Sequence, residues 1–305
     1  GNSVVPVPSA HVVYDLVPSV IAEIYIKVGH TDSLGIQETF KNQIESLVSQ
    51  GYRLAAAQAK VAHDAILLAM SRCGFKAHST IKGGVVMSHI TNDIRRTTMD
   101  MDIAFIRRSI SDLSVQRFVR KLNCLPGIKI SQFGMISELR HDDYRGKRIH
   151  LDVSDSSLTT PIRTKLDIGV HTHNEIDQVD YHFELTSASE STELFVNPNE
   201  QIFTEKLLSL LRHRTLSTRP KDIFDMYYLI EKVDLQKLSF CFNTLIYSNK
   251  KIHPNNINDI IAILSDVFSS RQFRRRLSTA KANWLMIEPS EVVGKLIDFL
   301  KTLKK

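Results

Sequence analysis

The feature that most constrains this chain is a pair of glycines followed, within one short helix and loop, by two aspartates one residue apart. The glycines are Gly83 and Gly84, and the aspartates are Asp100 and Asp102. Side chains two apart on a strand share a face, so the two carboxylates stand roughly 7 Å apart at their α-carbons. A glycine turn before a helix and two carboxylates on one strand indicate a nucleotide-and-metal site. This pattern predicts phosphoryl or nucleotidyl transfer.

The glycine pair can be interpreted in two ways. Glycine lets the backbone approach a phosphate closely, and the helix that follows presents unpaired N–H groups and the positive end of its dipole. Alone, such a pair is more often an ordinary strand-to-helix turn. The aspartates that follow favour the phosphate interpretation. Arg96 would bind a phosphate through two N–H groups, or would instead form a salt bridge that orients the aspartates. Thr98 lies on the same face as Asp100 and Asp102.

Two metal ions need a third carboxylate beside Asp100 and Asp102. Mg²⁺ takes oxygen ligands and in this chemistry lies between carboxylates and substrate phosphates. Asp167 and Asp152 each lie between apolar residues in a predicted strand. The residues alone leave both candidates open.

A second group of polar residues lies in the C-terminal part. Lys206 lies at the border of an apolar helix stripe, where a lysine can also extend harmlessly to solvent. Asp222 and Asp225 are three residues apart on one face of a helix that follows Pro220. Carboxylates in a first helical turn usually cap the helix, but two that face inward beside apolar residues are less usual.

The order of predicted elements gives the architecture: an α/β (α+β) nucleotidyltransferase-like mixed sheet domain, followed by an all-α helical bundle domain. We expect an N-terminal arm over 1–37, the sheet domain over 38–190 and the helical domain over 197–305, with a polar linker near 187–192 between them. Strands are predicted near 80–82, 99–107, 129–133, 147–153, 165–170 and 181–185. Helices are predicted near 38–72 (broken at Gly51), 85–90, 111–122, 198–213, 219–232, 234–247, 255–268, 270–282 and 289–303.

Composition sets looser limits. The chain has 305 residues and a net charge of +6, which suits a polyanionic partner such as RNA. Its three cysteines show no paired spacing, so we expect free thiols in a reducing compartment. No run approaches the length of a membrane span, and the first residues lack the pattern of a signal peptide. We therefore expect a cytoplasmic location and no membrane partner.

Taken together, these residues resemble the AbiEii/AbiGii-type toxin nucleotidyltransferases, which include the MenT-like toxins, within the DNA polymerase β-like superfamily. Five motifs occur in the family's order and cover roughly residues 80 to 230. They are Lys82-Gly83-Gly84, Arg96-Thr97-Thr98-Met99-Asp100-Met101-Asp102, Lys165-Leu166-Asp167-Ile168-Gly169, Glu205-Lys206-Leu207, and the run from Arg219-Pro220-Lys221-Asp222 through Asp225 to Leu229. One departure is that Val85 and Val86 stand where family members often carry Ser or Thr.

The resemblance implies a role for each motif in a cleft between the two domains. Asp100, Asp102 and Asp167 would hold two Mg²⁺ ions, and the resemblance favours Asp167 over Asp152. The backbone at Gly83-Gly84 would cradle the triphosphate of an NTP. The resemblance also implies catalytic roles for Lys206, Asp222 and Asp225, and nucleotide binding by Lys82, Gly83, Gly84, Arg96, Thr98, Lys206, Arg219 and Lys221.

It also implies a toxin with a cognate antitoxin, belonging to a type IV-like toxin–antitoxin or abortive-infection system. The expected activity is Mg²⁺-dependent transfer of NMP from an NTP to RNA, most plausibly to the 3′ end of tRNA. Two alternatives remain: transfer to a hydroxyl of a protein or small molecule, and a non-catalytic nucleotide- or RNA-binding module. The arginines at 271, 274, 275 and 276 form a basic helix face, which is a candidate surface for acceptor docking.

Overall fold

The computed structural model describes residues 38–141 and 144–304, so the predicted N-terminal arm lies outside the described residues. The strands are β1 (Ser79–Lys82), β2 (Asp100–Ile106), β3 (Ile128–His141), β4 (Tyr144–Asp155), β5 (Ile162–His171), β6 (Val179–Phe183) and β7 (Thr192–Val196). The helices are α2 (Phe40–Ser49), α3 (Leu54–Arg72), α4 (Gly83–Thr91), α5 (Asp112–Leu122), α6 (Asn199–His213), α7 (Lys221–Leu229), α8 (Leu235–Phe242), α9 (Ile257–Ser269), α10 (Arg271–Leu277) and α11 (Pro289–Thr302).

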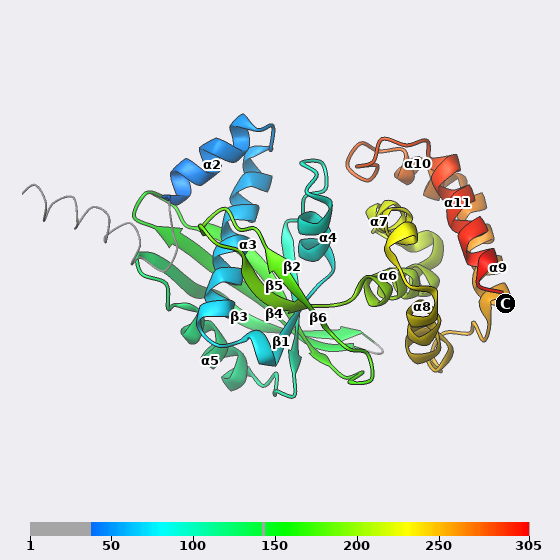
Figure 1. The fold of residues 1–305 in the computed structure, drawn as a ribbon, viewed down its shortest axis with the longest axis horizontal. Coiled ribbons are helices and arrows are strands. Elements are labelled where there is room, and N and C mark those ends of the chain that lie inside the picture. The colour runs from blue at the N-terminus through cyan, green and yellow to red at the C-terminus, as the bar shows by residue number, and fades with distance from the viewer. Residues whose placement is uncertain (1–37, 142–143, 305) are drawn as a thin grey trace, which may run out of the picture.

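Within the described residues, the strands form one mixed sheet of seven strands in the order β3-β4-β5-β2-β1-β7-β6. The pairs β2/β5 and β1/β7 are parallel, and the remaining neighbours are antiparallel. The C-terminal helices α6 to α11 gather beside this sheet, in yellow-green to red (Figure 1). The predicted architecture, a mixed sheet followed by a helical bundle, is confirmed.

One face of the sheet is apolar and covered by helices. Ile149, Leu151 and Leu166 are fully buried on this face, where α3 packs against β4 and β5, and α5 packs against β3. The nineteen residues of α3 are rich in alanine and buried around most of the helix, which lets it lie close to the strands. The opposite face of β2, β4 and β5 carries polar side chains, because successive residues of a strand alternate between faces.

Strand β7 was not predicted. Thr192, Leu194 and Val196 are buried and alternate with partly buried Glu193 and Phe195, but the strand has only five residues and follows a polar segment. It pairs with β1 through Ile81 and Val196. The sheet therefore extends past residue 190, the expected end of the first domain, and the division into two domains stays a prediction.

The expectation of three free thiols is wrong for two of them. Cys73, which ends α3, and Cys124, which follows α5, form a disulfide with their α-carbons 6.7 Å apart. The fold brings these two positions together across 51 residues of sequence, a proximity that cysteine spacing does not reveal. Cys241 is free and buried.

Smaller differences concern the ends of elements. Helix α6 begins at Asn199 with Pro198 as its N-cap, one residue later than predicted. The predicted helix over 234–247 divides into α8 and a π-helical turn over Asn243–Tyr247. Among the residues that the structure describes, no helix has the length and apolar character needed to cross a membrane.

Candidate active site

The glycine turn joins β1 directly to α4. Gly83 has a φ of +51°, a conformation that favours glycine. A Cβ on Gly84 would lie 2.7 Å from Thr98 Oγ1, so only glycine lets Thr98 approach this closely. No side chain caps the first turn of α4, which leaves its N–H groups open to an anion.

Thr98 is the hydroxyl closest to this turn in the family motifs. Its Oγ1 donates to the carbonyl of Asp100 at 3.0 Å, and the same side chain packs against Gly84 of α4. Val85 and Val86, which stand where family members often carry Ser or Thr, are both buried. The phosphate contact that such a hydroxyl would supply is therefore absent from these two positions.

Four side chains form a row across neighbouring strands beside the turn; we call it the first row. Register pairs Lys82 of β1 with Asp102 of β2, Asp102 with Asp167 of β5, and Asp167 with Arg148 of β4. Side chains directly opposite one another share a face of the sheet. Asp102 and Asp167 are therefore adjacent on the polar face, with a cationic residue at each end of the row.

A second row lies next to the first on the same face, two residues earlier on β2 and β5 and two residues later on β4. Asp100 of β2 pairs in register with Lys165 of β5, which pairs with His150 of β4, and His150 pairs with Phe133 of β3. The Lys165 ammonium lies 2.8 Å from an oxygen of Asp100. Asp100 and Asp102 thus stand on one face of β2, as the sequence predicted.

The carboxylate of Asp102 is held close to other charges. Burial, and then the neighbouring carboxylate of Asp167, raise the pKa of Asp102, while the positive charge of Arg219 opposes this rise. Arg219 lies in the loop before α7, so a residue from the C-terminal part of the chain acts on the first row. Two adjacent carboxylates that disfavour each other's charge are a suitable setting for a cation.

The three carboxylates have the oxygen chemistry that a pair of hard cations needs, and they lie on one face of adjacent strands. Asp167 already accepts two hydrogen bonds of 2.8 Å from the Arg148 guanidinium, and Asp100 holds Lys165, so cationic groups stand at both. In the described part of the chain, no three His, Cys, Asp or Glu side chains converge closely enough to hold a metal. We attribute this to the two ion pairs, which turn Asp100 and Asp167 toward protein cations.

The other candidate for third carboxylate, Asp152, lies elsewhere on the same face. It is on β4, two strands from β2, and it forms a two-pronged ion pair with Arg163 at 2.8 and 3.1 Å. Asp167 is the direct neighbour of Asp102 in register. The geometry favours Asp167.

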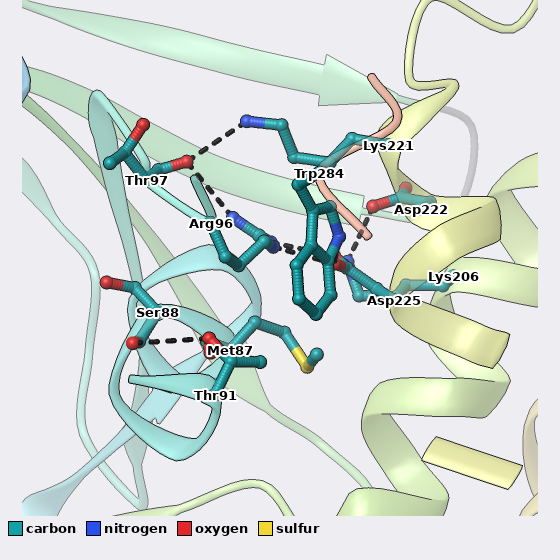
Figure 2. Close-up of polar contacts among 10 residues, drawn as sticks. All are labelled: Met87, Ser88, Thr91, Arg96, Thr97, Lys206, Lys221, Asp222, Asp225 and Trp284. Atoms are coloured by element: carbon teal, nitrogen blue, oxygen red, sulfur yellow. Dashed lines mark hydrogen bonds and ion pairs between the residues drawn. The ribbon is translucent and has the colours of Figure 1, made fainter. Parts of the chain in front are cut away.

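A second cluster joins the strand β2 region to the helical part; we call it the clamp. Arg96 donates to both oxygens of Asp225, at 2.6 and 2.7 Å, and both side chains are buried. The Lys206 ammonium lies 2.5 Å from Asp222 and 2.9 Å from Asp225. Trp284 Nε1 donates to Asp225 at 3.0 Å. Figure 2 shows Arg96, Lys206 and Trp284 converging on this one carboxylate.

The electrostatics of the clamp favour its charged state. Burial disfavours the charge on Asp225, but Lys206 and Arg96 outweigh it and lower its pKa. Burial likewise opposes the charge on Lys206, and Asp222 and Asp225 raise its pKa above the ordinary lysine value. Arg96 therefore forms a salt bridge, as one of the two interpretations expected, but with Asp225 rather than with the aspartates of β2.

Lys221 completes the connection. Its ammonium donates to the carbonyl of Thr97 at 3.0 Å, and Arg96 Nη1 donates to the same carbonyl at 3.1 Å (Figure 2). Burial, together with the nearby charge of Arg96, lowers the pKa of Lys221 to about 8. The residue before Thr98 is thus fastened to the start of α7.

The predicted site residues therefore occupy two adjoining groups. Lys82, Gly83, Gly84, Thr98, Asp100, Asp102, Asp167 and Arg219 surround the polar face of β2, and Arg96, Lys206, Lys221, Asp222 and Asp225 form the clamp. Lys82 also lies 3.3 Å from Glu205 of α6, a second contact between the two parts of the chain.

Sequence reasoning missed Arg148, Lys165 and Trp284. Lys165 precedes Asp167 by two residues on one strand, so the two-residue period could have placed it on the same face. Arg148 reaches Asp167 only through the pairing of β4 with β5. Trp284 lies 59 residues from Asp225 in a segment without a periodic pattern, and no sequence signal identifies it.

Comparison with known proteins adds a family to this geometry. A family model described as "Nucleotidyl transferase AbiEii toxin, Type IV TA system" matches residues 65–290. The matched residues include the glycine turn, the first and second rows, and the clamp. No curated protein matches the chain.

Several solved structures have a similar arrangement at low sequence identity. JHP933 from Helicobacter pylori is 14% identical, with a TM-score of 0.49 over 83% of this chain and 94% of its own. A putative nucleotidyltransferase from H. pylori is 14% identical, with a TM-score of 0.47 over 82% and 94%. An antigenic nucleotidyltransferase-like protein from Paracoccidioides brasiliensis is 16% identical, with a TM-score of 0.41 over 76% and 98%.

Proposed function

Because this chain belongs to the AbiEii family of nucleotidyltransferase toxins from type IV toxin–antitoxin systems, we propose that it transfers a nucleoside monophosphate from an NTP to RNA, at the 3′ end of tRNA. Membership implies an NTP as substrate and an antitoxin as partner. The RNA acceptor and the dependence on Mg²⁺ belong to the proposal.

The observation that carries the proposal is the first row. Asp102 and Asp167 are direct neighbours on one sheet face. Gly83, at the start of α4, lies beside Asp102: a Cβ added to this glycine would be 3.7 Å from Asp102 Oδ2. The same few residues thus offer carboxylate oxygens and helix N–H groups. Bound Mg²⁺ would lower the pKa of the attacking hydroxyl and neutralise charge on the triphosphate.

The residues of the chain have separate tasks in this reaction. The N–H groups at Gly83 and Gly84 would hold the β- and γ-phosphates, and the exposed guanidinium of Arg219 lies near enough to Asp102 to face the same phosphates. The acceptor hydroxyl would form a bond to the α-phosphorus and lose its proton to solvent. The bond from the α-phosphorus to the bridging oxygen breaks, and pyrophosphate leaves.

An RNA acceptor is supported by charge. The chain carries a net charge of +6, and cationic side chains flank the carboxylates on the polar face, among them Arg148, Lys165 and Arg163. The net positive charge attracts a polyanion, and the attraction weakens with salt.

The test is incubation of the purified protein with total tRNA, Mg²⁺ and each labelled NTP separately. We expect label in tRNA from at least one NTP and none with Asp102→Asn, which keeps the shape of the side chain and removes its charge. Circular dichroism would verify that the variant is folded. Full transfer by this variant would overturn the assignment of Asp102.

Other results would redirect the proposal. Label in polypeptide or in a small molecule would identify a different acceptor. Tight NTP binding without turnover would indicate a binding module rather than an enzyme. Either result contradicts transfer to RNA.

The same assay decides between the two candidates for third carboxylate. Asp167→Asn should abolish transfer, since Asp167 is next to Asp102. Asp152→Asn, which removes a similar two-pronged ion pair from the same face, should leave most transfer intact. The reverse result would move the third ligand to Asp152.

A further inference from the structure

The second row extends the active site across the sheet. From Asp100 it runs through Lys165 and His150 to Phe133, which lies on the edge strand β3. Neighbouring strands are about 4.8 Å apart, so three strand spacings place Phe133 roughly 14 Å from Asp100. A few nucleotides of single-stranded nucleic acid cover such a span.

The face on which this row lies is open at its far end. Phe133 is 48% exposed although it is aromatic, and Arg163, on the same face, is also exposed. The centre of the Arg163 guanidinium lies 3.3 Å from the centroid of the Phe133 ring. The core does not use this ring, since the buried side of β3 is formed by Ile128 and Ile130.

An exposed aromatic ring stacked on a guanidinium is the platform that unpaired bases use. RNA-binding proteins recognise single strands by stacking bases on aromatic rings and on arginine planes, with cations along the backbone. Here Phe133 and Lys165 lie on the second row, which ends at the proposed metal ligand Asp100, and Arg163 lies on the same face two residues before Lys165. A partner protein would not need this alignment with the reacting atoms.

The charges on the face match such a strand. Lys165 and Arg148 are held by Asp100 and Asp167. If Asp100 and Asp167 held Mg²⁺, as in the proposed function, Lys165 and Arg148 would be released from these carboxylates. Lys165 and Arg148 would face the acceptor phosphates only in the metal-loaded state.

We propose that the second row is a track for the unpaired 3′ strand of the acceptor RNA, with its bases stacked on Phe133 and Arg163 and its backbone along Lys165. This inference rests on the proposed function, because it takes the reacting 3′ hydroxyl to lie at Asp100 and Asp102. It moves the acceptor away from the helix α10. One of the four arginines there, Arg276, is turned inward and donates to the carbonyls of Thr215 and Ser217.

The test measures RNA binding by the full chain without NTP. The probe is a single-stranded RNA of about 12 nucleotides with a free 3′ hydroxyl and a fluorophore at its 5′ end, followed by anisotropy with Mg²⁺ present. Loss of one stacking partner costs roughly 5- to 100-fold in Kd, and we expect this loss for Phe133→Ala. Phe133→Trp should retain binding, and Arg163→Gln should weaken it.

Two controls locate the effect. Met135→Ala removes an 87% exposed side chain from the same hairpin, at the irregularity between Phe133 and Ser137, and should bind RNA as the wild type does. The double change Arg271→Glu and Arg274→Glu reverses charge on α10 and should change Kd less than Phe133→Ala does. Thermal melting would verify that each variant is folded.

The outcomes separate this inference from the proposed function. Wild-type binding in Phe133→Ala and Arg163→Gln, a loss confined to the α10 variant, or no RNA binding by the wild type would overturn the track. RNA binding that depends on Phe133, without transfer of label to RNA, would uphold the track and contradict the proposed reaction.

Discussion

Charged side chains in this site are divided between two tasks that sequence motifs do not separate. Arg96 and Lys206 belong to motifs that suggest phosphate binding, but Asp225 occupies both of them inside the protein. Asp100 and Asp167 are held by Lys165 and Arg148 at the partly exposed end of the site. The buried pairs fasten the structure, and in the proposed function the outer pairs would exchange partners when substrate and metal bind.

This exchange predicts that Arg148 competes with a metal ion for Asp167. Arg148→Gln should raise the affinity for Mn²⁺ about fivefold, because a partly exposed ion pair contributes about 1 kcal/mol. The measurement is Mn²⁺ titration followed by electron paramagnetic resonance. Arg163→Gln breaks the matching ion pair with Asp152 and should leave the affinity unchanged. An equal rise in both variants would refute the competition.

The close approach of Thr98 predicts a specific cost for a methyl group at Gly84. Gly84→Ala would push Thr98 Oγ1 away and weaken its hydrogen bond to Asp100, so NTP affinity should fall about tenfold. Gly294→Ala is the control, since its Cβ meets open space within α11; it should stabilise the protein by roughly 0.5–1 kcal/mol. Calorimetric titration with NTP measures this affinity. An unchanged affinity in Gly84→Ala would show that the close approach of Thr98 to Gly84 is not needed for NTP binding.

Between elements, the clamp fixes the start of β2 against α7. Arg96 and Asp225 are 129 residues apart in sequence, and Trp284 reaches the same carboxylate from the segment after α10. Local periodicity predicted the helices and strands on which these residues lie, but it gave no information on which side chains meet. Periodicity within one strand placed Asp100 and Asp102 on a common face. It could not place Arg148, because that residue meets Asp167 only through the pairing of β4 with β5.

The clamp predicts a large loss of stability when one buried charge is removed. Asp225→Asn leaves Arg96 and Lys206 without their shared partner, and should lower the free energy of unfolding by about 3–5 kcal/mol. Trp284 is the only tryptophan of the chain, so its fluorescence reports unfolding in urea. Asp298→Asn, in an exposed pair with Lys301, should change stability by less than about 0.5 kcal/mol. Equal effects would show that the clamp does not hold the elements together.

The buried His63 of helix α3 should make the stability of the protein depend on pH. His63 is buried against Thr164, and burial, opposed by Asp64, lowers its pKa to about 4. The unfolded chain therefore binds a proton that the folded chain excludes, and stability falls as pH decreases from about 6.5 toward 4, by about 3 kcal/mol in total. Urea unfolding at pH 7 and pH 5 should show a smaller difference for His63→Gln. The exposed His253, changed to Gln, should leave the difference as in the wild type, and an unchanged difference in His63→Gln would contradict this role.

Across the whole molecule, the sequence predicted the order and type of elements better than their assembly. Asp100 and Asp102 alternate with apolar residues on β2, and the polar face of this strand was predicted correctly. The short strand β7 and the Cys73–Cys124 disulfide depend on contacts between distant segments, so composition and spacing did not reveal them. The proposed active site is itself such an assembly, since strands of the sheet supply its carboxylates and the loop before α7 supplies Arg219.

The central claim is that one face of β2 and β5 transfers a nucleotide from an NTP to RNA. The most direct measurement is the ratio of pyrophosphate released to nucleotide incorporated into tRNA in a single reaction. We expect equal amounts of both in the wild type, and loss of both in Asp102→Asn. Pyrophosphate released without incorporation into RNA, or undiminished incorporation by Asp102→Asn, would contradict it.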